Sequence, residues 1–131
     1  MSIMMMMEAD SRLSESEVLD ALSSCGVSEV VNRHDGFSGN FPSSNMFFTY
    51  ERSADDQKDI RTEGMRDSDW SVGCRLIFVY VIPYLVECES QLSHFLQVIS
   101  DVSEANWVLS FQYESIYAVR DENGFRKLVE F

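Results

Sequence analysis

The segment Glu87–Asp101, ECESQLSHFLQVISD, places a cysteine and a histidine among acidic residues, a set that could bind a metal ion or catalyse hydrolysis. In a helix, Cys88 and His94 would point about 120° away from each other. Glu87 and His94 would share a face, but they would lie about 10 Å apart along the helix axis. A single metal ion with ligand bonds of about 2 Å cannot join them. The spacing therefore predicts no metal site in this segment.

A cysteine nucleophile activated by a histidine is the second chemistry to consider, because the chain has three cysteines and two histidines. No nucleophile signature surrounds any of them, so a small Cys/His hydrolase is the least favoured functional alternative. The glycine-containing stretch DGFSGNFP matches neither common phosphate-loop pattern and has no lysine. We therefore expect no catalytic residue, no cofactor and no metal ion. The cysteines and histidines considered for a catalytic pair are Cys25, Cys74, Cys88, His34 and His94.

Apolar residues recur at steps of three and four through the same segment, which predicts an amphipathic helix over Glu87–Asp101. These residues are Leu85, Cys88, Leu92, Phe95, Leu96, Ile99 and Val102. The outward side is acidic, because Glu87, Glu89, Asp101 and Glu104 have no lysine or arginine between them. We interpret these four carboxylates as a candidate partner-binding surface. The alternative is an ordinary solvated helix face.

Three aromatic residues stand in or beside stretches that read as loops, namely Phe37, Phe41 and Trp70. Aromatic side chains are enriched at the energetically dominant positions of protein interfaces. We expect these three to be candidate contacts for a protein partner. The alternative is that they fold over the edge of the sheet and belong to the core.

The remaining pattern predicts an α+β fold with a single, largely antiparallel sheet of about four to six strands and two helices, at least one packed on one face. The first helix starts at a capping box formed by Ser14 and Glu17. A polar stretch between Glu51 and Asp69 is expected to be a mobile loop or a frayed helix. Alternating or β-branched segments predict strands at 46–52, 70–82, 107–114, 115–121 and 125–131.

The length of 131 residues fits a single domain. Residues 1–12 have neither a periodic pattern nor a cap, so we expect a flexible N-terminal tail, followed by one α+β domain over residues 13–131. The four consecutive methionines do not form a signal peptide, and no apolar run reaches the length of a membrane span. An odd number of widely spaced cysteines favours free thiols. These features predict a soluble cytoplasmic protein.

Charge is the strongest compositional signal, with 22 acidic and 10 basic residues and a formal net charge of −12. This excess argues against binding to nucleic acid or to anionic membranes, both of which require a basic surface. It favours either solubility alone or rapid association with a basic protein.

In size, charge and the ending WVLSFQYESIYAVRDENGFRKLVEF, the chain resembles small acidic bacterial immunity proteins of contact-dependent and polymorphic toxin systems. The resemblance implies a protein inhibitor, monomeric when free, that binds a cognate toxin domain, often a basic nuclease, in a one-to-one complex. The resemblance lies in these general features and not in a motif that can be aligned, so no functional residues are carried over from the family. The alternative is a small acidic secretion chaperone that binds an effector. Such chaperones dimerise and usually end in a helix, whereas this chain ends in a predicted strand.

Overall fold

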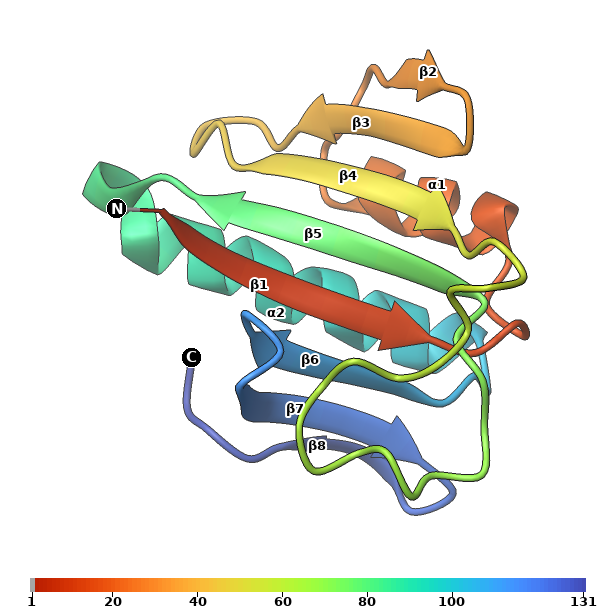
Figure 1. Cartoon of the computed structure of the whole chain (residues 1–131). Helices are drawn as coiled ribbons and strands as arrows, with labels where there is room; N and C mark the ends of the chain where they lie inside the picture. Colours follow the sequence, from red (N-terminus) through yellow and green to blue (C-terminus); the bar gives the residue numbers. More distant parts are fainter. Residues whose placement is uncertain (1) are drawn as a thin grey trace.

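The computed structural model describes residues 2–131, which form one eight-stranded antiparallel sheet with two helices on one face (Figure 1). The strand order is β2-β3-β4-β5-β1-β6-β7-β8. The elements are β1 (Ile3–Ala9), α1 (Glu15–Ser24), β2 (Val31–Arg33), β3 (Gly36–Asn40), β4 (Phe47–Arg52), β5 (Cys74–Tyr80), the 3₁₀ turn η1 (Ile82–Tyr84), α2 (Leu85–Val102), β6 (Trp107–Phe111), β7 (Ser115–Asp121) and β8 (Gly124–Lys127). The α+β class and the antiparallel sheet are confirmed. The predicted count of four to six strands was wrong.

The prediction of a flexible tail over residues 1–12 was also wrong, because Ile3–Ala9 forms the strand between β5 and β6. Its side chains alternate, with Met5 and Met7 fully buried against the helices and Met4 and Met6 on the opposite face. Methionine is unbranched and has no marked strand preference, and a run of identical residues cannot display an alternation. The sequence pattern therefore hid a central strand.

Two further strands, β2 and β3, arise from a stretch rich in glycine, serine and asparagine that read as a loop. Gly36 is required where β3 approaches β4, since a Cβ atom there would collide with the carbonyl oxygen of Tyr50. Phe37 is paired with Tyr50 across the two strands, and their rings stack with centroids 4.7 Å apart. Close pairing with β4 thus overrides the weak strand propensity of these residues.

Both helices bury one stripe of side chains against the sheet. The predicted capping box of α1 is confirmed: Ser14 Oγ accepts from the Glu17 amide, and Glu17 Oε1 accepts from the Ser14 amide. The predicted helix over Glu87–Asp101 is confirmed as α2, which begins two residues earlier and ends one residue later. Its buried residues are Cys88, Leu92, Phe95, Leu96 and Ile99. Among residues 2–131, no helix is long and apolar enough to cross a bilayer.

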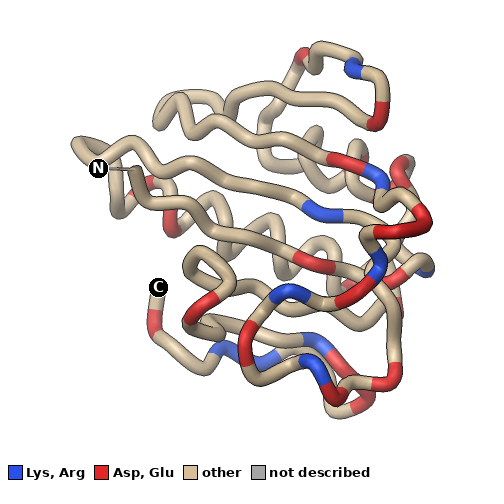
Figure 2. The backbone as a smooth tube through the Cα atoms, in the orientation of Figure 1, with Lys and Arg blue, Asp and Glu red and all other residues tan. Residues whose placement is uncertain are grey.

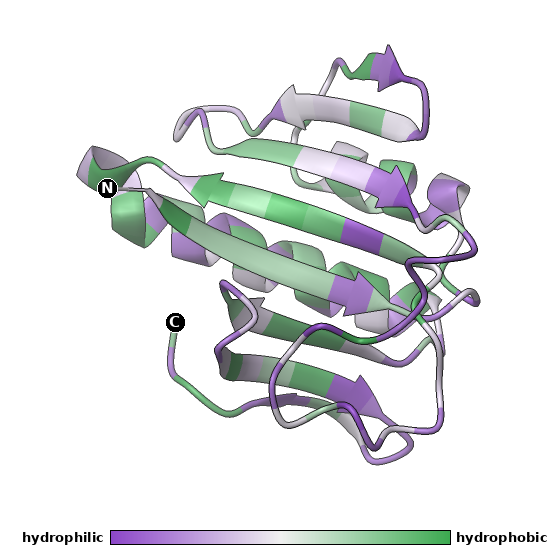
Figure 3. Ribbon diagram, in the orientation of Figure 1, coloured by the Kyte–Doolittle hydropathy of each residue, from purple (hydrophilic) through white to green (hydrophobic). Residues whose placement is uncertain are grey.

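The long segment between β4 and β5, residues 53–73, lies on the helix-free face of the sheet and contains no helix or strand (Figure 1). It is largely hydrophilic beside the apolar β5 (Figure 3). Nevertheless, Ile60 and Val72 are buried against Val108 and Val119, forming a second, smaller core. The polar connection is therefore packed onto β6 and β7, the strands that carry Val108 and Val119. We refer to it as the 53–73 loop.

A buried ion pair holds the 53–73 loop in place. Glu8 on β1 is fully buried and accepts hydrogen bonds from the Arg75 Nε and from the backbone amides of Arg61 and Thr62, at 2.9–3.2 Å. Arg75 on β5 also donates to the carbonyl oxygens of Gln57 and Asp59, at 2.6 and 2.7 Å. Both charged groups are thus hydrogen-bonded, which is the condition for tolerating them in a protein interior.

Candidate functional site

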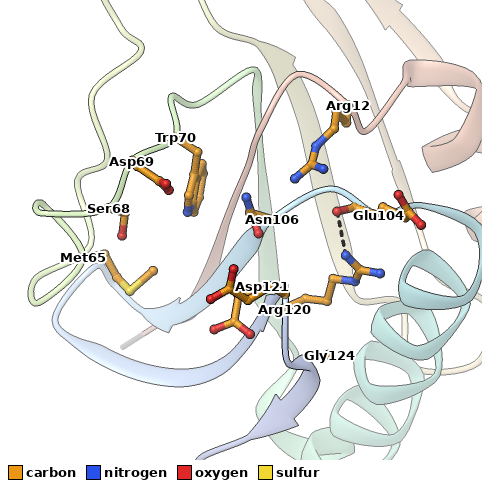
Figure 4. A pocket seen from close by; sticks show the side chains of 11 residues that line it. Arg12, Met65, Ser68, Asp69, Trp70, Glu104, Asn106, Arg120, Asp121 and Gly124 are labelled. Atoms are coloured by element: carbon orange, nitrogen blue, oxygen red, sulfur yellow. Dashed lines mark hydrogen bonds between the residues drawn. The ribbon is translucent and has the colours of Figure 1, made fainter.

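A polar cleft lies where the 53–73 loop meets the ends of β6, β7 and β8. Its volume is about 650 Å³. Two of the residues singled out in the sequence line it, Trp70 from the loop and Glu104 from the α2–β6 connection (Figure 4). Around them stand Arg12, Met65, Ser68, Asp69, Asn106, Arg120, Asp121, Glu122 and Gly124. We refer to this hollow as the Trp70 cleft.

The fold of the loop positions Trp70 at the edge of this cleft. The Val72 amide donates to the carbonyl oxygen of Lys58, and the Glu63 amide donates to that of Tyr113 in the β6–β7 turn, both at 2.8 Å. Trp70 is half-buried and packs against the second core. An indole held on one side and open on the other is a suitable anchor for a protein partner.

Arg12 and Asn106 line the opposite wall of the cleft, and Asp10, just after β1, lies behind them and bonds to both. Its Oδ2 accepts three hydrogen bonds, from Arg12 Nη2 and the Asn106 amide at 2.9 Å and from Arg12 Nε at 3.2 Å. Burial alone would raise the pKa of Asp10, but the hydrogen bonds from Arg12 and Asn106 outweigh it and hold the pKa below its usual value. Asp10 therefore fixes the position of Arg12 as a charged group at neutral pH.

The third side of the cleft comes from the β7–β8 hairpin. Arg120 Nη1 donates to the carbonyl oxygen of Glu104 at 2.6 Å, which ties the hairpin to the end of α2 (Figure 4). Asp121 forms two parallel bonds with Arg126, at 2.8 and 2.9 Å. These bonds, together with the Asn123 amide, lower the pKa of Asp121 to about 2.

The lining of the cleft can recognise charged or hydrogen-bonding groups. Four carboxylates and two guanidinium groups line it. Arg12 is paired with the Asp10 carboxylate, whereas Arg120 donates to the neutral backbone carbonyl of Glu104 and keeps its positive charge. The carboxylates of Asp69, Glu104 and Glu122 have no ion pair among residues 2–131. The uncompensated charge of the cleft is therefore negative.

The other three predicted acidic residues lie on a different surface. Glu87, Glu89 and Asp101 follow α2, whereas Glu104 belongs to the Trp70 cleft. Glu89 and Asp101 line a shallow groove of about 810 Å³ between α2 and the C-terminal segment. The four carboxylates predicted as one surface are thus separated: Glu104 lines the Trp70 cleft, Glu89 and Asp101 line this groove, and Glu87 lines neither.

Phe37 and Phe41 are not exposed partner contacts. Both side chains are 1% exposed, and Phe41 packs edge-on against Phe48 with ring centroids 5.6 Å apart. They lie in the main core on the helix side of the sheet. The alternative reading of these two residues, as core side chains, is the correct one, because β3 brings them over the sheet.

The cysteines and histidines do not come together. Cys88 is buried beneath α2, whereas His94 is exposed on its outer side, as the helical spacing predicts. Burial raises the pKa of Cys25 to about 11 and that of Cys74 to about 12, so both thiols are protonated at neutral pH. Among residues 2–131, no group of three potential ligands is placed to hold a metal ion.

Sequence reasoning missed the arginines of the cleft and the buried pair that orders its loop. A glutamate directly after four methionines, and an arginine within an apolar strand, were the available signals for Glu8 and Arg75. Nothing local marks Arg12 or Arg120, which meet only through the fold. Comparisons of the chain with protein-family models, with curated proteins and with solved structures found no match.

Proposed function

We propose that the chain is a protein inhibitor, an immunity protein that neutralises a cognate bacterial toxin by covering a basic surface of the toxin domain. A nuclease is the favoured target, because its phosphate-binding site is basic and a carboxylate-rich surface can occupy it. The protein would act in the cytoplasm as a free monomer that forms a one-to-one complex. The resemblance in size, charge and C-terminal sequence to small acidic immunity proteins motivates the proposal.

The observation that carries the proposal is the excess of carboxylates that remains after the salt bridges within the protein are counted. Five of the ten lysines and arginines pair with carboxylates: Arg12, Arg52, Lys58, Arg75 and Arg126. The chain has 22 acidic residues, so most carboxylates keep no basic partner within residues 2–131. Six acidic residues lie in the 53–73 loop, where three basic residues are interspersed with them (Figure 2). Four acidic residues line the Trp70 cleft. The negative electrostatic potential of these carboxylates increases the rate of association with a basic partner and orients that partner.

The Trp70 cleft supports a specific contact within this field. A half-buried tryptophan surrounded by polar groups has the anatomy of an interface hot spot, with an aromatic anchor and a charged rim. In the proposed complex, the indole of Trp70 packs on the toxin domain while Asp69 and Glu122 pair with its cations.

Protection from toxicity tests the proposal. The chain is co-expressed in a bacterial host with the toxin domain encoded beside its gene, and survival is counted. Protection, together with a one-to-one complex in gel filtration, would support the inhibitor role. Trp70→Ala should weaken the complex at least about tenfold, as expected for loss of a hot-spot residue. A toxin domain that kills with and without the chain would refute the proposal, and a stable dimer of the free chain would favour the chaperone alternative.

A further inference from the structure

The groove along α2 combines apolar and acidic side chains on one exposed surface. Val86, Glu89, His94, Val98 and Asp101 line it from the helix. Phe125, Lys127 and Phe131 line it from β8 and the C-terminal segment. Because α2 rises about 1.5 Å per residue, the lining from Val86 to Asp101 extends for about 22 Å, or four helical turns.

Most of the exposed large apolar side chains among the described residues belong to the elements that border this groove. Seven large hydrophobic residues are exposed, and six of them lie on α2, on the turn before it or on the C-terminal segment. These six are Ile82, Tyr84, Val86, Val102, Leu128 and Val129, with Val86 exposed by 81%. Val86 lines the groove itself, together with the partly exposed Val98, Phe125 and Phe131. An exposed apolar lining of this kind is typical of a contact surface.

The charges of the groove define the chemistry of its occupant. Glu89 and Asp101 stand about 18 Å apart along the helix axis, with apolar Val98 and Phe125 lining the space between them. Lys127 also lines the groove, but its ammonium group donates to the carbonyl oxygen of Phe131 at 3.0 Å and lies over that ring. Neither contact removes the positive charge of Lys127, so two carboxylates face one ammonium group and the lining keeps a net charge of −1.

We propose that this groove binds an amphipathic, basic segment of a protein partner, lying along α2 with its apolar side against Val86, Val98 and Phe125. Residues eleven positions apart on a helix share a face and lie about 16.5 Å apart, whereas residues twelve positions apart diverge by about 120°. Two cations eleven positions apart in a helical occupant therefore pair with Glu89 and Asp101. The net charge of −12 disfavours a second copy of the chain as the occupant. The inference goes beyond the inhibitor proposal, because the groove would recognise such a segment in any partner.

A synthetic helix tests the groove without any knowledge of the natural partner. The probe is a fluorescent peptide of about 18 residues, long enough to span the groove, with leucine on one face and lysine on the other. Its binding to the full chain is followed by fluorescence anisotropy at low salt and at about 0.15 M salt. The wild-type chain should bind this peptide and not a peptide in which glutamate replaces lysine.

Two charge-matched variants separate groove binding from general attraction. Glu89→Lys with Asp101→Lys should weaken binding about tenfold or more, because both pairing positions become repulsive. Asp20→Lys with Glu29→Lys changes the net charge equally on exposed positions away from the groove and should weaken binding less than about twofold. Val86→Ser, at a position that is too exposed to affect folding, should weaken binding about threefold if the apolar contact forms.

NMR spectroscopy locates the binding site. Addition of the lysine peptide should change the backbone amide chemical shifts of α2 and of residues 125–131. Failure of the lysine peptide to bind, equal weakening by the two double variants, or shifts centred elsewhere would each overturn the inference. These results are independent of toxin protection. Loss of protection with intact peptide binding would refute the inhibitor role alone, and the reverse would refute the groove alone.

Discussion

Glu8 and Arg75 face each other on neighbouring central strands, with Arg75 Nε 3.0 Å from Glu8 Oε2 and both side chains shielded from solvent. Together they bond to the backbone of Gln57, Asp59, Arg61 and Thr62 and so help to hold the 53–73 loop against the sheet. Because the loop carries Trp70, this pair connects the interior of the domain to the candidate site.

Removing one partner of the pair should destabilise the fold strongly. Arg75→Met leaves the Glu8 carboxylate buried without its cation, and we expect a loss of about 3–5 kcal/mol in the free energy of unfolding. The double variant Glu8→Gln with Arg75→Met leaves no buried charge and should be less destabilised than the single variant. Urea unfolding of wild type, both single variants and the double variant measures the coupling. A coupling near zero would show that the pair does not act as a unit.

The same variants should change the loop before the rest of the domain. The 53–73 loop has few buried side chains, so its local opening requires less free energy than global unfolding once Glu8 and Arg75 no longer hold it. Limited proteolysis of Arg75→Met under native conditions should therefore cut first within residues 53–73. Cleavage that begins instead in α1 or β8 would contradict this order.

The free energy of unfolding should fall between about pH 4 and pH 2, because Asp10 and Asp121 beside the Trp70 cleft become protonated there. Folding lowers the pKa of Asp10 and of Asp121, the latter to about 2. The folded state then binds fewer protons than the unfolded state, so this stability is complete above about pH 4 and is lost as the pH falls towards 2. Urea midpoints measured across this range should fall less steeply in Asp10→Asn than in wild type, and Ser11→Asn provides a control that should keep the wild-type slope.

The thiols should be slow to react in the native state. The pKa values of about 11 for Cys25 and about 12 for Cys74 leave little thiolate at pH 8, and Cys88 is buried. A disulfide reagent should therefore label the native protein far more slowly than the urea-unfolded protein, in which all three cysteines react. A single fast-reacting cysteine in the native protein would revive the hydrolase alternative, and a Cys25→Ser variant would show whether Cys25 is responsible.

Local patterns predicted the elements that are built from local contacts. The helical spacing from Cys88 to Ile99 and the capping box at Ser14 need only neighbouring residues to act, and both appear in the structure. Features that depend on distant pairing were not predictable. The Glu8–Arg75 contact joins residues 67 positions apart, and Phe37 becomes a core residue only because β3 pairs with β4. The Trp70 cleft likewise exists only because four separate connections converge, those after β1, β4, α2 and β7.

Charge reversal on α2 compares the two candidate surfaces directly. Replacing Glu87, Glu89 and Asp101 by lysine should weaken binding to a basic toxin domain and reduce its dependence on salt, because attraction at these positions becomes repulsion. Trp70→Ala should instead weaken the complex with little change in salt dependence, because it removes an uncharged contact. Calorimetric titrations at several salt concentrations separate the two effects. Intact protection by the triple lysine variant would exclude the α2 carboxylates from the toxin interface and leave the Trp70 cleft as the contact.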